Sequence, residues 1–360
     1  MPSDLKRSSG VLDAAAADRL LAGMTDTQTD TLDFSEVTAI HFSALRKLMN
    51  ARRAGTRFHI INASDAVVDR FTDSGVSAFI DVARKPRTLD LAQYEEFGAS
   101  YLSKSYNSLD GDAMIKVYGA NMPPEQVARE KAVARAVMLF GLPTPLVGTL
   151  YADGEKTALD FERIQGKRSF SRIIAEEPER LEEITRRFAR MCRQLHSTPC
   201  DTALFEDRVR LHRDAVVRCN ELTDTEKRRI LEFVDRIPAA TTCLHGDLQM
   251  SNVITADGED LWIDLGEFGY GFPLLDLGMW YFLTKLNSEA NARQLFHLGL
   301  AELARIWDIF ADEYADAHTA QAREAFEREV LPYAGLHMIY LGANFGFQPW
   351  MPGAIRKILL

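Results

Sequence analysis

The sequence has no long apolar segment, no zinc-type cysteine pattern and no excess of positive charge. No stretch of about 18 uncharged apolar residues occurs, which excludes a membrane-spanning helix, and residues 1–30 lack the apolar core of a secretory signal. The four cysteines include no CxxC pair, which argues against a structural zinc site and a disulfide framework. A formal net charge of −10 leaves no surplus of Lys and Arg to neutralise nucleic-acid phosphates. We therefore expect a soluble cytoplasmic protein with no nucleic-acid partner and no membrane partner.

The length of the chain predicts two or three folded units, because 360 residues exceed one ordinary core. In residues 1–82, short strand patterns alternate with helix patterns; residues 42–54 form a clear helix and residues 58–62 a clear strand. This alternation predicts a small α/β domain with a mainly parallel sheet. The charged, proline-containing stretch that follows predicts a linker over residues 83–92.

After the linker the pattern changes to antiparallel strands and then to helices, which predicts an α+β domain. Asp110-Gly111 is a strong hairpin signal between two strand-like segments. A helix is expected over residues 125–140, opened by proline and closed by glycine. From Ser169 onward the patterns are mostly helical, apart from a strand-rich island over residues 243–265.

The residues that carry chemistry lie in this island. His245-Gly246-Asp247 is followed by Asn252, and a second apolar strand ends in Asp264. Phosphoryl transfer from ATP requires an acceptor hydroxyl that is relieved of its proton, and Mg²⁺ held against the phosphates. Asp247, a carboxylate on a turn, suits the first task as the catalytic base. Asn252 and Asp264 suit the second as metal ligands, because hard Mg²⁺ prefers oxygen ligands.

These residues could also be ordinary polar loop residues, and an isolated His-x-Asp would favour that interpretation. The spacing HxDxxxxN, followed by an apolar strand that ends in Asp264, favours catalysis. The segment resembles the core of the aminoglycoside phosphotransferase and choline kinase superfamily, which is related to the protein kinases. The resemblance implies that Asp247 is the base and that Asn252 and Asp264 bind the metal. It also implies structural roles for His245 and for the downstream Asp276.

A nucleotide-binding lobe should precede such a core. Lys116 is a lone cation in an apolar strand, so it could pair with the α- and β-phosphates of ATP or be a solvated strand residue. Glu130 lies on the next helix, where it could hold Lys116 as the strand lysine and helix glutamate do in kinases. Glu125 shares this helix and is the alternative partner. The downstream core favours the nucleotide role for Lys116 and Glu130.

Two further segments complete the expected nucleotide site. A turn that includes Gly98 and Ser100 would cover the phosphates with backbone N–H groups, although the glycine repeat of protein kinases is absent. The strand that ends at Glu162 resembles the hinge between the two lobes of the kinase-like superfamily. By that resemblance, backbone groups of Phe161, Glu162 and Ile164 would meet the adenine.

Within the first domain, residues 32–45 resemble the signature of STAS domains, the fold of anti-sigma factor antagonists. The resemblance implies a partner-binding module that is often switched by phosphorylation of a serine at a helix N-terminus. His41 stands where that family usually has aspartate, and Phe42 stands where it has the serine. Ser43 is the candidate substitute phosphosite. We interpret the domain as a docking or dimerisation module.

The predicted fold is an α/β N-terminal STAS-like domain followed by an α+β two-lobed protein-kinase-like domain. The boundaries are residues 1–82 for the first domain, 83–92 for the linker, 93–164 for the N-lobe and 165–360 for the helical C-lobe. The predicted function is ATP- and Mg²⁺-dependent transfer of the γ-phosphoryl group to a small-molecule hydroxyl acceptor, with a protein partner bound through the N-terminal domain. Two alternatives use the same residues: a protein kinase that acts on a regulatory partner, and a nucleotide-sensing scaffold without catalysis.

Overall fold

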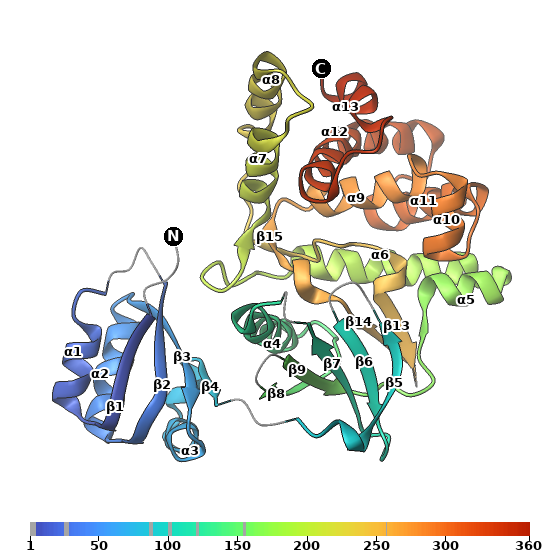
Figure 1. The fold of residues 1–360 in the computed structure, drawn as a ribbon. Coiled ribbons are helices and arrows are strands. Elements are labelled where there is room, and N and C mark those ends of the chain that lie inside the picture. Colours follow the sequence, from blue (N-terminus) through green and yellow to red (C-terminus); the bar gives the residue numbers. More distant parts are fainter. Residues whose placement is uncertain are drawn as a thin grey trace. The chain divides into compact units, whose positions relative to one another are not determined.

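The chain divides into two compact units, whose secondary structure is shown in Figure 1. Unit 1 comprises residues 1–131 and 147–161, and unit 2 comprises residues 132–146 and 162–360. The structure is a computed structural model that describes residues 5–24, 29–85, 89–99, 103–119, 122–153, 156–256 and 258–360.

Unit 1 begins with a wholly parallel sheet in the order β1-β2-β3-β4. Helices alternate with its strands, so the expectation of a parallel α/β domain is confirmed. The elements are β1 (Leu5–Leu12), α1 (Ala14–Leu21), β2 (Thr29–Ile40), α2 (Phe42–Arg53), β3 (Arg57–Ala63), α3 (Asp65–Asp73) and β4 (Val82–Arg84). β4 pairs with β3 up to Arg84, so the sheet continues past residue 82.

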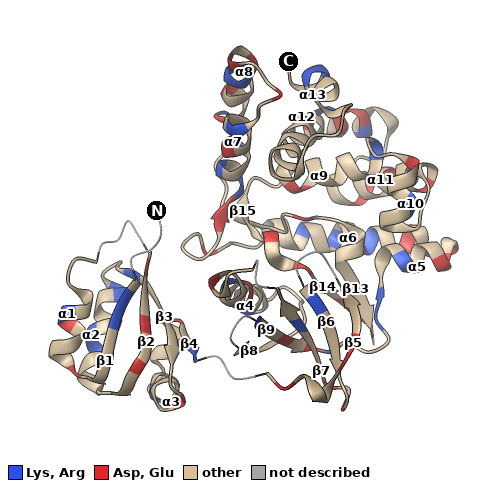
Figure 2. Ribbon diagram, in the orientation of Figure 1, with Lys and Arg blue, Asp and Glu red and all other residues tan. Residues whose placement is uncertain are grey.

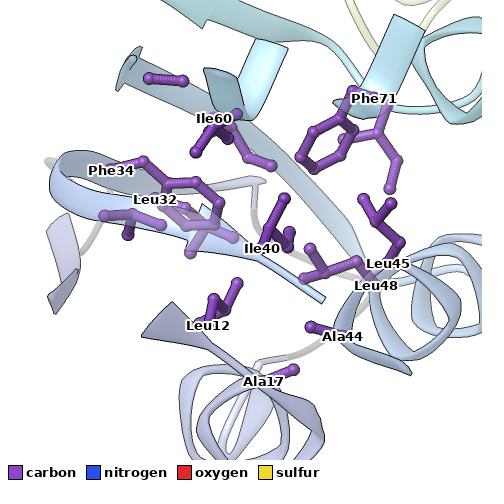
Figure 3. Close-up of a cluster of buried hydrophobic side chains, with 14 of the residues drawn as sticks. Leu12, Ala17, Leu32, Phe34, Ile40, Ala44, Leu45, Leu48, Ile60 and Phe71 are labelled. Carbon is purple, nitrogen blue, oxygen red and sulfur yellow. The ribbon is translucent and has the colours of Figure 1, made fainter. Parts of the chain in front are cut away.

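The core of this sheet lies between its strands and the three helices (Figure 3). Leu32 and Phe34 on β2 are fully buried and, two residues apart, they lie on the same face of the strand. Leu45 and Leu48, three residues apart on α2, reach the same core from one side of the helix. Only Leu12 of β1 is buried. Because the other residues of β1 are at least partly exposed, the sequence pattern does not predict this strand.

The second sheet of unit 1 has the order β5-β6-β7-β9-β8. Its strands are β5 (Tyr94–Ala99), β6 (Ser103–Ser108), β7 (Ala113–Tyr118), β8 (Val147–Asp153) and β9 (Lys156–Glu162). The predicted hairpin is confirmed: β6 and β7 pair antiparallel, and Gly111 in their turn has φ 83°, a conformation that glycine adopts readily. Helix α4 (Pro124–Leu139) follows β7 and matches the expected helix.

Unit 2 is mostly helical and contains two small sheets, in the orders β10-β13-β14 and β11-β15-β12. This arrangement confirms the strand-rich island that the sequence predicts within a helical region. The elements are β10 (Arg168–Ser169), α5 (Phe170–Glu176), α6 (Leu181–Ser197), β11 (Glu206–Asp207), α7 (Arg208–Arg218), α8 (Asp224–Val234), β12 (Thr242–Leu244), β13 (Val253–Ala256), β14 (Glu259–Trp262), β15 (Gly269–Gly271), α9 (Leu274–Lys285), α10 (Glu289–Phe296), α11 (Leu300–Ala315), α12 (Ala320–Phe345) and α13 (Met351–Leu359).

Helix α9 is the central helix of unit 2, because ten of its twelve residues are buried. Gly278 allows close packing on α12: a Cβ added there would lie 2.4 Å from the backbone carbon of Tyr333. Trp280 is fully buried, with its ring centroid 5.1 Å from that of Phe188 on α6. Among the residues that the structure describes, no helix has both the length and the hydrophobicity needed to cross a bilayer.

The surface helices of unit 2 carry charges of both signs (Figure 2). On α6, Arg187 pairs with Glu183 one turn earlier, as residues four apart on a helix do. Arg187 also donates to both carboxylate oxygens of Asp260 on β14, which ties this helix to the strand that precedes Asp264.

Candidate active site

The loop that carries Asp247 connects β12 to β13 in unit 2, and His245 anchors it from within. His245 is fully buried and donates through Nε2 to the carbonyl oxygen of Ile263, at 3.1 Å. Its Nδ1 accepts the N–H of Asp247, at 3.3 Å, which agrees with an imidazole that carries its proton on Nε2. The sequence-based expectation of a structural role for His245 fits these contacts.

Asp276 on α9 binds the backbone of the same loop. Its carboxylate accepts the backbone N–H groups of His245 at 2.7 Å and Gly246 at 2.9 Å. Nε2 of His196 lies 3.2 Å from the same carboxylate, and Nδ1 of His196 lies 2.8 Å from the Tyr314 hydroxyl. Burial alone would raise the pKa of Asp276, but the His196 contact and the backbone donors hold that pKa below its usual value. Asp276 is therefore an ionised, buried brace for the loop.

Gly246 is a glycine because nothing larger fits. Its φ is 81°, and a Cβ added there would lie 2.0 Å from the carbonyl oxygen of Glu267. The Glu267 side chain in turn accepts from Arg208 on α7 and Tyr340 on α12, both at 2.8 Å. The buried Arg208 guanidinium also lies over the Tyr340 ring, at 5.1 Å. These contacts connect two helices to Glu267, whose backbone lies against Gly246.

The Asp247 carboxylate receives three N–H contacts from two nearby amide side chains. Nε2 of Gln249 lies 3.1 Å from each carboxylate oxygen, and Nδ2 of Asn252 lies 2.8 Å from Oδ2. Nδ2 of Asn252 also donates to the backbone oxygen of Asp247, at 2.9 Å. Such donors fix a carboxylate in place without taking all four of its lone pairs, so Asp247 can still accept a proton.

The expected metal ligands also lie at this loop. Because Nδ2 of Asn252 faces Asp247, its Oδ1 is the amide atom left to bind a cation. The backbone N–H of Ile263 donates to the carbonyl oxygen of Asn252, at 3.0 Å, which brings the next residue, Asp264, close to this site. Asp264 is exposed and has φ 61° and ψ 55°, a left-handed conformation that costs a non-glycine residue about 1–3 kcal/mol. Strain of this size at a candidate ligand is typical of functional sites.

The donor set fits a magnesium ion better than zinc. Within the described parts of the chain, no group of three or more His, Cys, Asp or Glu side chains could hold a metal. A kinase-type magnesium site needs only one amide and one carboxylate from the protein, because phosphates and water supply the other oxygens. Asn252 and Asp264 are one amide and one carboxylate that could fill this role.

The predicted lysine and glutamate meet in unit 1. Nζ of Lys116 on β7 lies 3.2 Å from Oε1 of Glu130 on α4, and the Tyr118 hydroxyl donates to Oε2 of Glu130 at 2.7 Å. Nζ of Lys116 is also 5.6 Å from the centre of the Phe161 ring. Glu125 is exposed on the first turn of α4, so Glu130 is the partner of Lys116.

The remaining residues of the expected nucleotide site are distributed along the chain. Gly98 lies on β5, and no described atom lies within 4 Å of the position that a Cβ would take there. Ser100 lies outside the described residues. Phe161 ends unit 1, whereas Glu162 and Ile164 belong to unit 2. The N–H of Glu162 donates to Leu146, at 2.8 Å, so this N–H is already occupied.

Three contacts were not anticipated from the sequence. Gln249 follows Asp247 by only two residues, and its amide could have been recognised as a donor within reach of the carboxylate. Tyr118 lies two residues after Lys116 on the same face of β7, a spacing that also suggested contact with the same helix. No local signal joins Glu267 to Arg208, because 59 residues separate them.

A search of the curated proteins found no match. Among solved structures, the chain is similar to a thermostable mutant of aminoglycoside phosphotransferase APH(4)-Ia in complex with AMP-PNP and hygromycin B. They share 16% identity and a TM-score of 0.52, over 74% of this chain and 92% of that chain. The apo form of that mutant gives 16% identity and a TM-score of 0.50, over 74% and 93% of the two chains.

These two likenesses show a shared two-lobed, protein-kinase-like fold. Residues 96–327 match the phosphotransferase enzyme family (APH), which is more than half of the chain. The match begins after the N-terminal α/β domain and contains Lys116, Asp247 and Asp264. The chain therefore belongs to the phosphotransferase enzyme family, whose members are ATP-dependent kinases that act on hydroxyl groups.

Proposed function

We propose that this chain transfers the γ-phosphoryl group of ATP, with Mg²⁺, to a hydroxyl group of a small molecule. The observation that carries the proposal is the arrangement of Asp247: an ionisable carboxylate held by Gln249 and Asn252, on a loop anchored to buried Asp276. Asp264 lies one residue beyond the backbone contact between Asn252 and Ile263. These residues supply a base and two metal ligands, which are the groups that phosphoryl transfer requires.

Asp247 acts in this proposal as the catalytic base. It accepts the proton of the acceptor hydroxyl as the hydroxyl oxygen attacks the γ-phosphorus. The contacts of Asp247 with Gln249 and Asn252 keep the carboxylate from rotating away, so the group is in place before the acceptor binds.

Lys116 would bind the α- and β-phosphates, held in place by Glu130. Gly98 and Ser100 would contribute to the cover of the phosphates, and the backbone of Phe161, Glu162 and Ile164 would meet the adenine. Asn252 and Asp264 would hold the magnesium ion. When bound, the ion neutralises charge on the phosphate oxygens during transfer.

We further propose that residues 1–82 form a STAS-like docking domain that brings a protein partner to the kinase. Its parallel sheet with helices supports this assignment. Ser43 is exposed on the first turn of α2, and the N-cap residue His41 makes no side-chain hydrogen bond there. A phosphate at Ser43 would thus meet a helix N-terminus, where negative charge is favoured. A cytoplasmic location without nucleic-acid or membrane partners also belongs to this proposal.

The test is transfer of label from γ-labelled ATP, with Mg²⁺, into a cell extract that is then separated into small-molecule and protein fractions. The matched control is Asp247→Asn, which keeps the shape of the side chain but removes the base. Label in the small-molecule fraction that depends on Asp247 supports the proposal. Label confined to proteins would replace it with a protein kinase, and no Asp247-dependent label would leave the nucleotide-sensing scaffold.

A further inference from the structure

Gln249 is held rigidly at the side of the candidate base. Its backbone is extended, with φ −156° and ψ 156°, and its carbonyl oxygen accepts the N–H of Asn252 at 3.0 Å. The short helix Met250–Asn252 starts directly after it, and the following Ser251 bonds to Ser171 of α5 and to the backbone of Leu295. The Gln249 side chain is thus presented to Asp247 by a backbone that is held by the contacts of the residues that follow it.

The two carboxylate oxygens of Asp247 differ in their contacts. Oδ2 accepts from both Gln249 and Asn252, whereas Oδ1 accepts from Gln249 alone among the described residues. Each carboxylate oxygen offers about two lone pairs in the plane of the group. Oδ2 is therefore saturated, and Oδ1 retains one lone pair for a further donor.

We infer that Gln249 is a positioning residue for the catalytic base: it bridges both oxygens, fixes the plane of the Asp247 carboxylate and leaves Oδ1 as the oxygen that accepts the acceptor proton. This inference rests on the proposed function. Without Gln249, Asn252 would hold only Oδ2, and the carboxylate could turn about its Cβ–Cγ bond. A base turned away from the acceptor hydroxyl slows transfer even when its chemistry is unchanged.

The O–H bond of the acceptor breaks and its proton moves to Oδ1 of Asp247. The electron pair of the acceptor oxygen forms the new bond to the γ-phosphorus. The bond between the γ-phosphorus and the bridging oxygen breaks, and ADP leaves with that electron pair.

The experiment uses the full chain with three single substitutions. Gln249→Met keeps the length of the side chain and removes the donor, and Gln249→Glu keeps its shape but replaces the donor with a negative oxygen. Gln194→Met, on the exposed side of α6, is the control for the substitution itself. The readout is the initial rate of label transfer from γ-labelled ATP into the small-molecule fraction, at fixed extract and varied ATP.

We expect Gln249→Met and Gln249→Glu to lower the maximal rate about 10-fold or more, with the KM for ATP unchanged within about twofold. Gln194→Met should match the unmodified chain. In the Asp247→Asn background, Gln249→Met should cause no further loss, because a positioning residue acts only through the group it positions. If Gln249 had only a structural role, the rate losses of the two single substitutions would instead multiply in the double variant.

Three outcomes would overturn the inference. An unchanged maximal rate in both Gln249 variants would show that the contact does not matter for transfer. Independent, multiplying losses in the double variant would assign Gln249 a structural role. Label transfer in the unmodified chain that does not depend on Asp247 would overturn the proposed function and this inference with it, and the Asp247→Asn control distinguishes that case from the other two.

Discussion

The loop around Asp247 in unit 2 and the Lys116–Glu130 pair in unit 1 are held in different ways. The loop is fixed by backbone N–H groups that bond to Asp276, whose side chain is only 3% exposed. Lys116 and Glu130 meet through side chains alone, which are 26% and 21% exposed. Loss of a buried ionic brace leaves other buried groups unsatisfied, whereas loss of a partly solvated contact is compensated in part by water.

The two regions should therefore respond differently to substitution. In the catalytic loop, substitutions behind the base should affect folding and activity together. In the lysine–glutamate pair, substitutions should change nucleotide affinity by smaller steps and leave stability nearly unchanged. All four tryptophans, at positions 262, 280, 307 and 350, belong to unit 2, so their fluorescence reports the unfolding of that unit.

The largest effect should come from Asp276→Ala. The substitution leaves the N–H groups of His245 and Gly246 without their buried acceptor, so we expect a loss of about 3–5 kcal/mol in the free energy of unfolding. Urea unfolding followed by tryptophan fluorescence measures it. The control is Asp235→Ala, which removes an exposed ion pair with Arg213 and should cost less than about 1 kcal/mol. Equal unfolding midpoints for the two variants would contradict the role of Asp276 as a brace.

The next largest effect concerns pH and two buried histidines behind the loop. Burial lowers the pKa of His337 to about 3 and, together with the charge of Arg208, lowers that of His212 to about 4. The unfolded chain takes up these protons near pH 6.5, but the folded chain does not. The contribution of each neutral histidine to the free energy of unfolding is thus fully present above about pH 6.5. As the pH decreases toward 4, the free energy of unfolding falls by about 3 kcal/mol for one histidine.

The measurement is urea unfolding of unit 2 at about pH 7 and about pH 4.5. His337→Phe, which also removes an Nε2 atom that has no partner in the described structure, should lose less stability over this interval than the unmodified chain. His318→Phe changes an exposed histidine and should leave the pH dependence as it is. If His337→Phe shows the full pH dependence, protonation of His337 does not contribute to it.

A smaller effect is expected for Glu130→Gln in unit 1. The substitution keeps the shape of the side chain but removes the negative charge beside Lys116, so Lys116 is held less firmly for the phosphates. We expect MgATP to bind about 10-fold more weakly by calorimetry, with little change in stability. The matched control, Glu125→Gln, lies on the same helix but is exposed, and it should bind as the unmodified chain does. Equal affinities for both variants would remove Glu130 from the nucleotide site.

The smallest effect should follow Tyr118→Phe. It removes the hydroxyl that donates to Oε2 of Glu130 at 2.7 Å and leaves the ion pair to Lys116 in place. One hydrogen bond of about 1 kcal/mol predicts roughly fivefold weaker MgATP binding. Tyr106→Phe on the neighbouring strand β6 is the control. In the Glu130→Gln background, Tyr118→Phe should cause no further loss of MgATP affinity. A further loss of affinity in this double variant would show that Tyr118 acts through a group other than Glu130.

Much of the fold could be predicted from local patterns. Helix α2 was expected over residues 42–54 and spans Phe42–Arg53, because its apolar residues recur at helical spacing. β1 escaped prediction because an exposed strand has no apolar alternation. β2 runs to Ile40 although Ser35 and Glu36 interrupt its apolar pattern, because its pairing with β1 continues past them.

Local sequence patterns alone single out the candidate chemical residues of this protein. The spacing from His245 to Asn252 and the apolar strand before Asp264 predict a base and two oxygen ligands on neighbouring segments, and β13 and β14, which lie between Asn252 and Asp264, pair antiparallel. Local spacing of this kind can be recognised without knowledge of the fold.

Only the tertiary structure decided what holds these residues. His196 reaches Asp276 across 80 residues, and Arg208 reaches Glu267 across 59. Neither contact has a local signal, because each joins residues that lie far apart along the chain. The candidate base can thus be recognised from a short motif, whereas its rigid placement depends on long-range contacts that form when the whole of unit 2 folds.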